Sequence, residues 1–161
     1  MTEPVIRNAG SAEEVRAVGA LFLEYAGRHL GPDLTLESMS AEVALLPGDF
    51  QPPRGRLLLA TVKDESAGCV ALRPIADGVG EVKRLYVRPA MRGLGIGRSL
   101  LSTLRSEARQ AGYRLLRLDT IHEMHAAIEL YRSFGFREIT AYHDDFIEPR
   151  RFFELEVGDA R

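Results

Sequence analysis

The spacing of hydrophobic positions changes several times along the chain, and each change predicts an element. Apolar residues recur at three- and four-residue steps, as on one face of a helix, in residues 12–30, 36–46, 99–111 and 124–134. Short apolar runs rich in β-branched and aromatic residues are typical of strands, and they occupy residues 5–7, 57–62, 68–72, 82–87, 115–119, 136–139 and 152–157. The chain is therefore expected to mix helices with a sheet.

Several boundary residues support these elements. Ser11 and Glu14 have the spacing of a capping box at the start of the first helix. Gly112 and Gly135 stand where glycines that end helices are expected. The proline-rich segment 47–55 is expected to carry no regular structure.

The order of the elements indicates how the sheet is built. Strands 57–62 and 68–72 are joined by a short polar segment and most simply form an antiparallel hairpin. Strands 82–87 and 115–119 flank a helix, which normally makes a right-handed parallel crossover. The sequence predicts an α+β fold in a single domain over residues 1–161, with a mixed, mostly antiparallel sheet and helices on both faces.

The stretch 81–99 carries the clearest chemical signal. A β-favouring run ends at Pro89, and three glycines, Gly93, Gly95 and Gly97, precede the next helix. Glycines let the backbone adopt positive φ and approach a ligand closely. A helix N-terminus attracts anions, and the arginines of the turn add full charges. These features predict a phosphate or pyrophosphate at residues 92–99.

The identity of the phosphate ligand depends on the motif. The turn lacks the lysine of a Walker loop, and Arg98 stands where a dinucleotide fingerprint has its third glycine. The match is to Arg-x-x-Gly-x-Gly, formed by Arg92, Gly95 and Gly97 after a strand. Here the chain resembles the GNAT superfamily of N-acetyltransferases, and residues 127–136 resemble the second signature of that family. The resemblance covers roughly residues 56–157, and a nucleotide-binding enzyme is the weaker alternative.

The resemblance implies acetyl-CoA as co-substrate and a GNAT-like fold. It places the pyrophosphate on the glycine-rich turn and the pantetheine arm on a local distortion at the end of the strand before it. That distortion is expected to free backbone N–H groups that also polarise the acetyl carbonyl. The expected cofactor-binding residues are Leu85, Tyr86, Val87, Arg92, Gly93, Leu94, Gly95, Ile96, Gly97, Arg98 and Ser99.

Two residues are candidate catalytic groups. Glu81 begins the central strand, and period-two alternation puts it on one face with Leu85 and Val87. Family members often have a glutamate at this place that deprotonates the amine, and partial burial is expected to raise its pKa. A solvated or ion-paired carboxylate is the alternative. Tyr131 matches the family's general acid, and a core tyrosine with a satisfied hydroxyl is its alternative.

The chain also departs from the family pattern. Many members carry an asparagine near the start of the last helix, where this chain has Met124. The resemblance implies an acceptor pocket built from the first two helices and the loop between the last strands. Those segments contribute Glu24, Tyr25, His29, Tyr142, Asp144, Asp145, Phe146 and Glu148.

Composition narrows the function classes. The chain has 161 residues, of which 45% are hydrophobic and 27% charged, as in ordinary globular domains. A net charge of −2 offers no basic field for nucleic acid. No apolar run has membrane-spanning length, and no signal-peptide core precedes the domain. A cytoplasmic protein is therefore expected.

The remaining candidate groups favour no other chemistry. Cys69 is the one cysteine and is expected to be a buried thiol. His122 and His125 have no third ligand in sequence reach, so no metal is expected. His122 follows the strand 115–119 and is expected on a surface loop.

The sequence thus predicts an N-acetyltransferase that moves an acetyl group from acetyl-CoA to a primary amine of a small molecule or amino acid. A protein N-terminus or lysine is a less favoured acceptor. A non-catalytic acyl-CoA-binding module is the alternative from another class, since it would need neither Glu81 nor Tyr131. A homodimer is left open, and neither nucleic acid nor membrane is expected as a partner.

Overall fold

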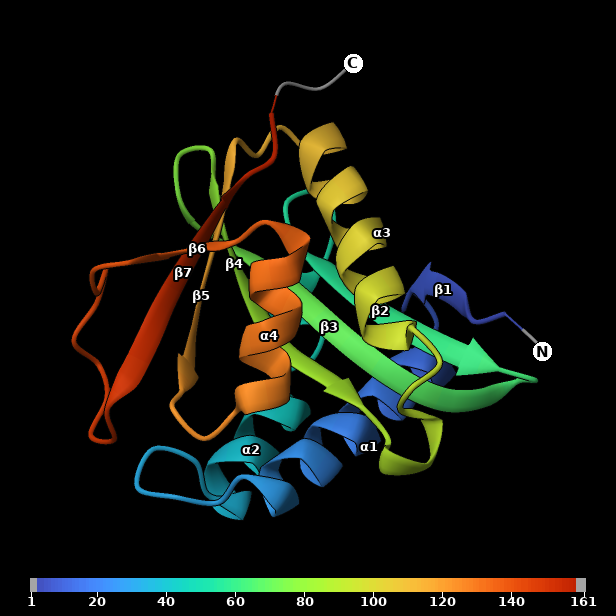
Figure 1. Ribbon diagram of the computed structural model, residues 1–161. Coiled ribbons are helices and arrows are strands. Elements are labelled where there is room, and N and C mark those ends of the chain that lie inside the picture. The colour runs from blue at the N-terminus through green and yellow to red at the C-terminus, as the bar shows by residue number, and fades with distance from the viewer. Residues whose placement is uncertain (1–2, 159–161) are drawn as a thin grey trace.

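The computed structural model describes residues 3–158, which form a sheet of seven strands covered by helices on both faces (Figure 1). The strands are Val5–Asn8 (β1), Arg56–Val62 (β2), Glu65–Ala76 (β3), Val79–Val87 (β4), Leu115–Ile121 (β5), Arg137–Ile139 (β6) and Arg150–Glu156 (β7). The helices are Ala12–Arg28 (α1), Leu36–Ala44 (α2), Ile96–Gln110 (α3) and His125–Phe134 (α4).

The strand order is β1-β2-β3-β4-β5-β7-β6, and only β4 and β5 pair in parallel. The predicted hairpin of β2 and β3 and the crossover from β4 through α3 to β5 are both confirmed. The hairpin turn is tighter than predicted, because Lys63 and Asp64 alone join the strands, both with positive φ. Positive φ at both central residues is the geometry that matches the twist of paired strands.

The sheet separates two hydrophobic cores. Helices α3 and α4 bury residues such as Leu104 and Ile128 against one face, together with Phe153 of β7. Helix α1 covers the other face with Phe22, and α2 adds Met39. The single cysteine, Cys69, lies in this second core and is fully buried, as predicted.

The predicted helix boundaries are mostly confirmed. The Ser11 and Glu14 capping box is present at the start of α1. Gly112 and Gly135 follow α3 and α4 with φ of 94° and 112°, which favours glycine. Two expectations were wrong in extent: α2 ends at Ala44, and α3 begins at Ile96.

Segment 47–55 was predicted to lack regular structure, and this was wrong in part. Gly48–Phe50 forms a 3₁₀ turn whose Phe50 ring is buried beside Phe22, with ring centroids 6.3 Å apart. The apolar ring docks the turn on the core despite its prolines. Within residues 3–158 no helix is long and apolar enough to cross a membrane.

One irregularity in β4 decides where the site lies. The register between β3 and β4 shifts between Cys69 and Ala71, and Arg84 adopts a φ of 60° there. Such a bulge reverses the side-chain alternation beyond it. Lys83 is opposite Ala71 on the α1 side, whereas Leu85 and Val87 pack against the core under α3 and α4.

This bulge makes one prediction wrong. Glu81 lies on the same face as Lys83, so it does not share a face with Leu85 and Val87. The distortion that the family resemblance predicted at the end of this strand is present. Pairing of β4 with β5 also stops at Glu81 and Arg117, so the strands separate beyond that point (Figure 1).

Candidate active site

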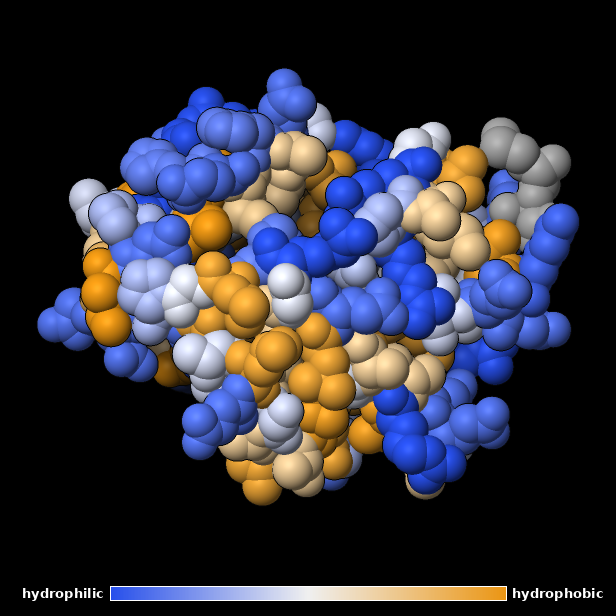
Figure 2. All heavy atoms as spheres, turned by 90° about the horizontal axis from the view of Figure 1, so that it is seen from below, coloured by the Kyte–Doolittle hydropathy of each residue, from blue (hydrophilic) through white to orange (hydrophobic). Residues whose placement is uncertain are grey.

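Two cavities open where β4 and β5 separate. The larger, of about 670 Å³, is lined by α1, β3, β4, β5, α4 and the loop before β7, and we call it the acceptor cavity. The smaller, of about 500 Å³, follows the end of β4 and the glycine-rich turn to the start of α4, and we call it the groove. His29, Leu85 and Met124 line both, so the two cavities adjoin there. From this end, charged and apolar side chains surround a recess (Figure 2).

The groove has the chemistry of an anion site. Gly95 is the N-cap of α3 with a φ of 76°, and no side chain caps that helix. Its first N–H groups therefore stay free to bind an anion. Arg92 donates to the Val87 carbonyl oxygen at 3.2 Å, and Arg98 donates to the Ser133 hydroxyl. Neither arginine pairs with a carboxylate of residues 3–158, so both charges remain available.

Glycine is required in the groove for two different reasons. A side chain at Gly95 would meet no atom within 4 Å, so its positive φ is what favours glycine. At Gly97 an added Cβ would lie 3.1 Å from Leu130 of α4, so close packing of the two helices favours glycine there. The groove thus depends on backbone conformation and small residues.

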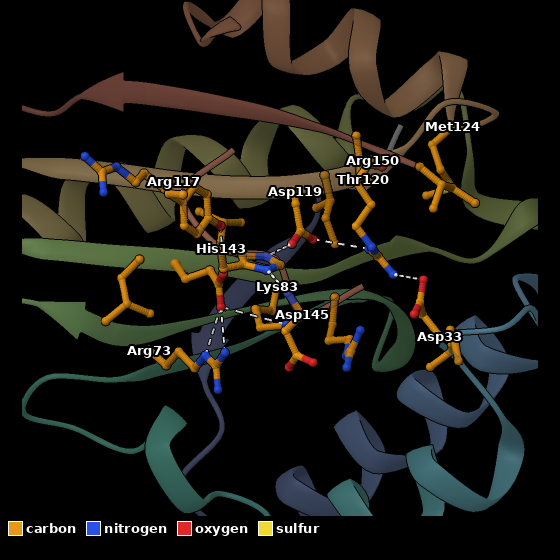
Figure 3. A pocket seen from close by; sticks show the side chains of 18 of the residues that line it. Asp33, Arg73, Lys83, Arg117, Asp119, Thr120, Met124, His143, Asp145 and Arg150 are labelled. Atoms are coloured by element: carbon orange, nitrogen blue, oxygen red, sulfur yellow. Dashed lines mark hydrogen bonds and ion pairs between the residues drawn. The ribbon is translucent and has the colours of Figure 1, made fainter. Parts of the chain in front are cut away.

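The acceptor cavity is instead lined by paired charges (Figure 3). Glu81 is only 5% exposed at its side chain, and Arg73 donates to its Oε1 through Nε at 2.9 Å. Arg73 Nη2 also lies 2.9 Å from this oxygen as an ion pair. Tyr142 donates to Oε2 at 2.7 Å. Lys83 Nζ lies farther away, 3.8 Å from Oε1. The carboxylate is thus held by hydrogen bonds from Arg73 of β3 and Tyr142 of the loop before β7, with the charge of Lys83 close by.

These neighbours reverse the expected shift of Glu81. Burial alone raises the pKa of the Glu81 carboxyl. The charges of Lys83 and Arg73 and the Tyr142 hydrogen bond outweigh burial, so the pKa lies below its ordinary value. The predicted rise in pKa was therefore wrong, because the sequence does not reveal the partners.

A second chain of contacts crosses the cavity from β5 to the loop after α1. Asp119 contacts His143 through Oδ2 and accepts from Arg150 at 3.3 Å through Oδ1. Arg150 also lies 3.5 Å from Asp33, which accepts from the backbone N–H of Ile147 at 2.7 Å (Figure 3). These contacts hold the loop before β7 against the rest of the cavity.

Tyr131 reaches the acceptor cavity from α4. Its ring is buried against Phe136 and Phe153, with centroids 5.6 and 6.3 Å away. Its hydroxyl makes no hydrogen bond within the described part of the chain, and every fully buried polar side-chain atom there has a partner. The hydroxyl must therefore face the cavity, which argues against a satisfied core tyrosine. Burial raises the pKa of Tyr131 above its ordinary value, so it carries its proton at neutral pH.

The structure brings most of the predicted residues together. Leu94 and Ser99 do not line the groove, and the other predicted cofactor residues do: Leu85, Tyr86, Val87, Arg92, Gly93, Gly95, Ile96, Gly97 and Arg98. Glu81 and Tyr131 line the acceptor cavity, as do Tyr25, His29, Tyr142, Asp145 and Glu148.

Other predicted pocket residues lie elsewhere. Glu24 pairs with Arg88 at 2.6 Å and lines neither cavity. Asp144 and Phe146 also line neither cavity, and Phe146 packs against His143 and Phe152. Spacing in a loop does not determine which side chains turn inward.

Several cavity residues were missed by sequence reasoning. They are Arg73, Lys83, Asp119, His143 and Arg150, which come from four strands and a loop. The only sequence signal was that Asp119 ends a predicted strand next to the central one. The pairing of these charges depends on the tertiary structure.

One group of side chains has the makings of a cation site. Glu81, Asp119 and His143 each offer a ligand atom, and these atoms lie within 4.8 Å of one another. The two carboxylates already accept from Arg73, Tyr142 and Arg150. A metal ion at this place would have to displace the guanidinium groups that lie beside the carboxylates.

His122 is exposed on the turn after β5, consistent with the prediction of a surface loop.

Comparisons with known proteins agree with this geometry. The sequence model of the acetyltransferase (GNAT) family matches residues 23–136. An uncharacterised N-acetyltransferase of Schizosaccharomyces pombe is 36% identical over 140 residues, covering 86% of this chain and 85% of the relative. An amino-acid acetyltransferase of Mycobacterium tuberculosis is 27% identical over 159 residues, covering 97% and 83%.

A solved structure shares the fold. A protein from Salmonella typhimurium, solved with its cofactor acetyl-CoA, superposes with a TM-score of 0.71 at 20% identity, covering 96% of this chain and 94% of that one. At this identity the likeness establishes the fold alone. The predicted single-domain arrangement of a mostly antiparallel sheet with helices on both faces is confirmed.

Proposed function

The chain belongs to the GNAT family of acetyltransferases and is an acyltransferase, and from this premise we propose that it moves an acetyl group from acetyl-CoA to the primary amine of a small molecule or amino acid. The observation that carries this proposal is that an anion groove and a polar cavity adjoin at Leu85 and Met124. A thioester bound along the groove would end where the cavity begins. The class argues against a non-catalytic acyl-CoA-binding module and against a nucleotide-binding enzyme.

The groove fits acetyl-CoA on chemical grounds. The uncapped N-terminus of α3 and the free charges of Arg92 and Arg98 suit a pyrophosphate. The lining of Leu85, Val87 and Met91 suits a less polar arm. Met124 begins α4 without a side-chain hydrogen bond, so it offers no substitute for the amide that many family members carry there. Acetyl-CoA would supply the activated acetyl group.

We assign the proton transfers to two groups of the acceptor cavity. The amine nitrogen forms a bond to the acetyl carbon, and the bond from that carbon to sulfur breaks. Tyr131 donates its hydroxyl proton to the departing thiolate, since its hydroxyl is protonated and faces the cavity. Glu81 accepts the proton that the amine loses, through water, because Arg73 and Tyr142 already occupy its oxygens.

The depressed pKa limits what Glu81 can do as a base. It stays ionised at neutral pH but is a weaker acceptor than the raised carboxyl that was expected. A water molecule that passes the proton on to solvent would make the low basicity of Glu81 less limiting. The bulge at Arg84 directly precedes Leu85, which lines the groove. Backbone N–H groups freed there would polarise the acetyl carbonyl, and donors of this kind typically contribute roughly 3 kcal/mol to lowering the barrier.

The acceptor is proposed to be small because charged side chains bridge the cavity. Arg150 joins Asp119 on β5 to Asp33 after α1, which narrows the path for a polypeptide. The amino-acid acetyltransferase of Mycobacterium tuberculosis acts, by its name, on an amino acid, and this supports the same class of acceptor here.

The proposal is tested with the purified protein in two steps. Melting temperatures are measured with acetyl-CoA, CoA, ATP and NAD, and stabilisation by the CoA compounds alone is expected. Thiol release from acetyl-CoA is then followed with a panel of amines, amino acids and peptides. Stabilisation by ATP or NAD without any by CoA would contradict the proposal. Turnover on peptides alone would keep the reaction and move the acceptor to a protein N-terminus or lysine.

A further inference from the structure

The cations of the acceptor cavity differ in how well they are paired. Arg73 contacts Glu81 at 2.9 Å, and Arg117 contacts Glu154 at 2.8 Å. Arg84 donates to both oxygens of Glu42 at 2.9 Å. Arg150, described above, bridges two aspartates. Each arginine lining the cavity therefore has a carboxylate of its own.

Lys83 is different. Its Nζ lies 3.8 Å from Glu81 Oε1, and this distance is too long for a hydrogen bond. The same oxygen already accepts a hydrogen bond from Arg73. It makes no hydrogen bond within residues 3–158, where all fully buried polar side-chain atoms are satisfied. The ammonium must therefore open onto the cavity, with its side chain 23% exposed. Its one ion-pair contact within residues 3–158 is the 3.8 Å approach to Glu81, which is too long for a hydrogen bond.

The surroundings of Lys83 disfavour its charged form. Burial and the nearby charge of Arg84 lower the pKa of Lys83, with only Glu81 and Asp119 acting against them. A partly desolvated ammonium is stabilised by any anion that completes its hydrogen bonds. The side chain points into the same cavity as Asp119 of the neighbouring parallel strand β5 (Figure 3). The two nearby carboxylates, Glu81 and Asp119, are each already paired with an arginine.

We propose that Lys83 binds an anionic group of the acceptor, so that the enzyme acetylates amines that also carry a carboxylate or a phosphonate. This inference rests on the proposed function and narrows its substrate class. Asp119 of the neighbouring strand also pairs with Arg150 and His143, and its negative charge lies in the same cavity as the ammonium form of such an acceptor. An acceptor with both charges would give Lys83 the hydrogen-bond acceptor that it lacks within residues 3–158, whereas a simple alkylamine would not.

The spacing favours a compact acceptor. Lys83 precedes Leu85 by two residues, and Leu85 lies where the cavity meets the groove. Lys83 and Leu85 both line the acceptor cavity, on either side of the bulge at Arg84. An acceptor that reaches from that junction to Lys83 within one cavity is small, as an amino acid or an aminoalkylphosphonate is. Lys83 is thus a specificity-determining residue and takes no part in proton transfer.

The test compares acceptors that differ only in charge. Each standard amino acid is paired with its amide, L-alanine also with ethylamine, and 1-aminoethylphosphonate serves as the phosphonate arm. Binding to the CoA-saturated protein is measured by calorimetry, and kcat/KM by thiol release. The wild type is expected to favour an acid over its amide by about 10- to 100-fold, mainly in KM. The two arms show which anion is preferred.

The variants separate recognition from structure. Lys83→Met is expected to bring the ratio of acid to amide close to one, and Lys83→Arg to restore most of it. Lys63→Met makes the same change on the exposed hairpin turn outside both cavities, and it should leave the ratio unchanged. A structural role for Lys83 would lower the melting temperature and affect acids and amides alike.

Failure of this inference is distinct from failure of the proposed function. If no acid binds or reacts better than its amide, or if Lys83→Met keeps the preference, Lys83 is not the anion site. The calorimetric arm decides this even without turnover. Absence of thiol release with every amine would instead contradict the proposed reaction.

Discussion

The groove and the acceptor cavity adjoin, yet backbone groups form most of the groove and side chains form most of the cavity. The groove consists largely of backbone and glycines from the contiguous turn 91–98 and the strand before it. Its arginines have no carboxylate partner within residues 3–158. The cavity is lined by side chains from distant segments that pair with one another, as Glu81 does with Arg73 and Tyr142. One region thus keeps its charges free for a ligand, and the other engages most of its charges internally.

Because of this difference, the two regions should tolerate different substitutions. Backbone N–H donors survive most side-chain substitutions, so the groove should be sensitive mainly at glycines with positive φ. In a network of paired side chains each change also affects the partners that are left behind. We therefore expect groove variants to alter cofactor affinity and cavity variants to alter turnover and selectivity.

The largest effect is expected at Tyr131, which lies on the cavity side of the junction. Tyr131→Phe should lower kcat by about 10²–10⁴-fold, because one positioned acid is lost. The dissociation constant for acetyl-CoA should change little, since Tyr131 does not line the groove. Steady-state kinetics and calorimetry measure the two quantities.

Tyr113 provides the matched control. Its hydroxyl donates to the Arg54 carbonyl oxygen at 2.6 Å and lies outside both cavities. Tyr113→Phe should reduce the free energy of unfolding by about 1 kcal/mol and leave kcat unchanged. If Tyr131→Phe behaves like Tyr113→Phe, Tyr131 is a packing residue and the assignment of the acid fails.

The next effect is expected in the groove. Gly95→Asp should weaken CoA binding on the order of 100-fold, since it adds a negative charge beside the pyrophosphate. Arg92→Ala should weaken it by only about tenfold, because the backbone donors remain. Affinity is measured by calorimetry on folded protein, and kcat at saturation should fall far less than affinity.

Gly112→Asp separates charge from backbone strain. Gly112 also has positive φ and open space around it, but it lies after the other end of α3. This variant should lose a similar amount of stability and keep its affinity for CoA. Equal losses of affinity in both variants would mean that strain in α3, and not the anion site, is being measured.

A smaller effect is expected at Glu81, and it tests whether this carboxylate accepts the proton of the amine. Glu81→Gln should lower kcat by about 10- to 100-fold, because a carboxylate of low basicity contributes less than a well-matched base. The folded pKa lies below the ordinary value of 4.5, so any acidic limb due to Glu81 must fall below about pH 4.5. The profile of kcat against pH measures this.

Glu154 is the control for Glu81. Its side chain is 8% exposed and pairs with Arg117 and Arg137, yet it does not line the cavity. Glu154→Gln should cost stability and lower kcat much less than Glu81→Gln does, because only its partner Arg117 lines the cavity. An acidic limb well above pH 4.5 that persists in Glu81→Gln would assign the proton acceptor to another group.

The smallest effect concerns stability at the bulge. Burial raises the pKa of Glu42, but its hydrogen bonds and charge interaction with Arg84 outweigh this and lower the pKa below 4.5. The stabilisation is therefore fully present above about pH 4.5 and is lost as the pH falls through the folded value. Glu42→Gln should lower the free energy of unfolding by about 1 kcal/mol at pH 7.

The pH dependence supplies the check. Chemical denaturation at a series of pH values should show a shallower loss of stability in Glu42→Gln below pH 4.5 than in the wild type. Glu138→Gln removes a more exposed carboxylate that pairs with Arg151, and its effect should be smaller. Equal effects of the two variants would mean that α2 does not hold the bulge through this ion pair.

The sequence by itself determined the order of elements and the groove. Hydrophobic periodicity and local caps depend on neighbours within a few positions, so the pattern predicted the hairpin, the crossover and the glycine at Gly112 correctly. The glycine-rich turn is likewise a contiguous signal, because a helix N-terminus binds anions through its own backbone. Of the residues that the turn predicted to bind the cofactor, Leu94 and Ser99 do not line the groove.

The acceptor cavity was decided by the tertiary structure alone. Because of the bulge at Arg84, Glu81 and Leu85 lie on different faces of the sheet. A period-two pattern of the sequence does not reveal the extra residue that a bulge inserts. The depressed pKa of Glu81 depends on Arg73 of β3 and Tyr142 of the loop before β7, which only sheet pairing and loop docking bring to it. Electrostatic environments depend on distances in space, and residues far apart in the chain acquire those distances only on folding.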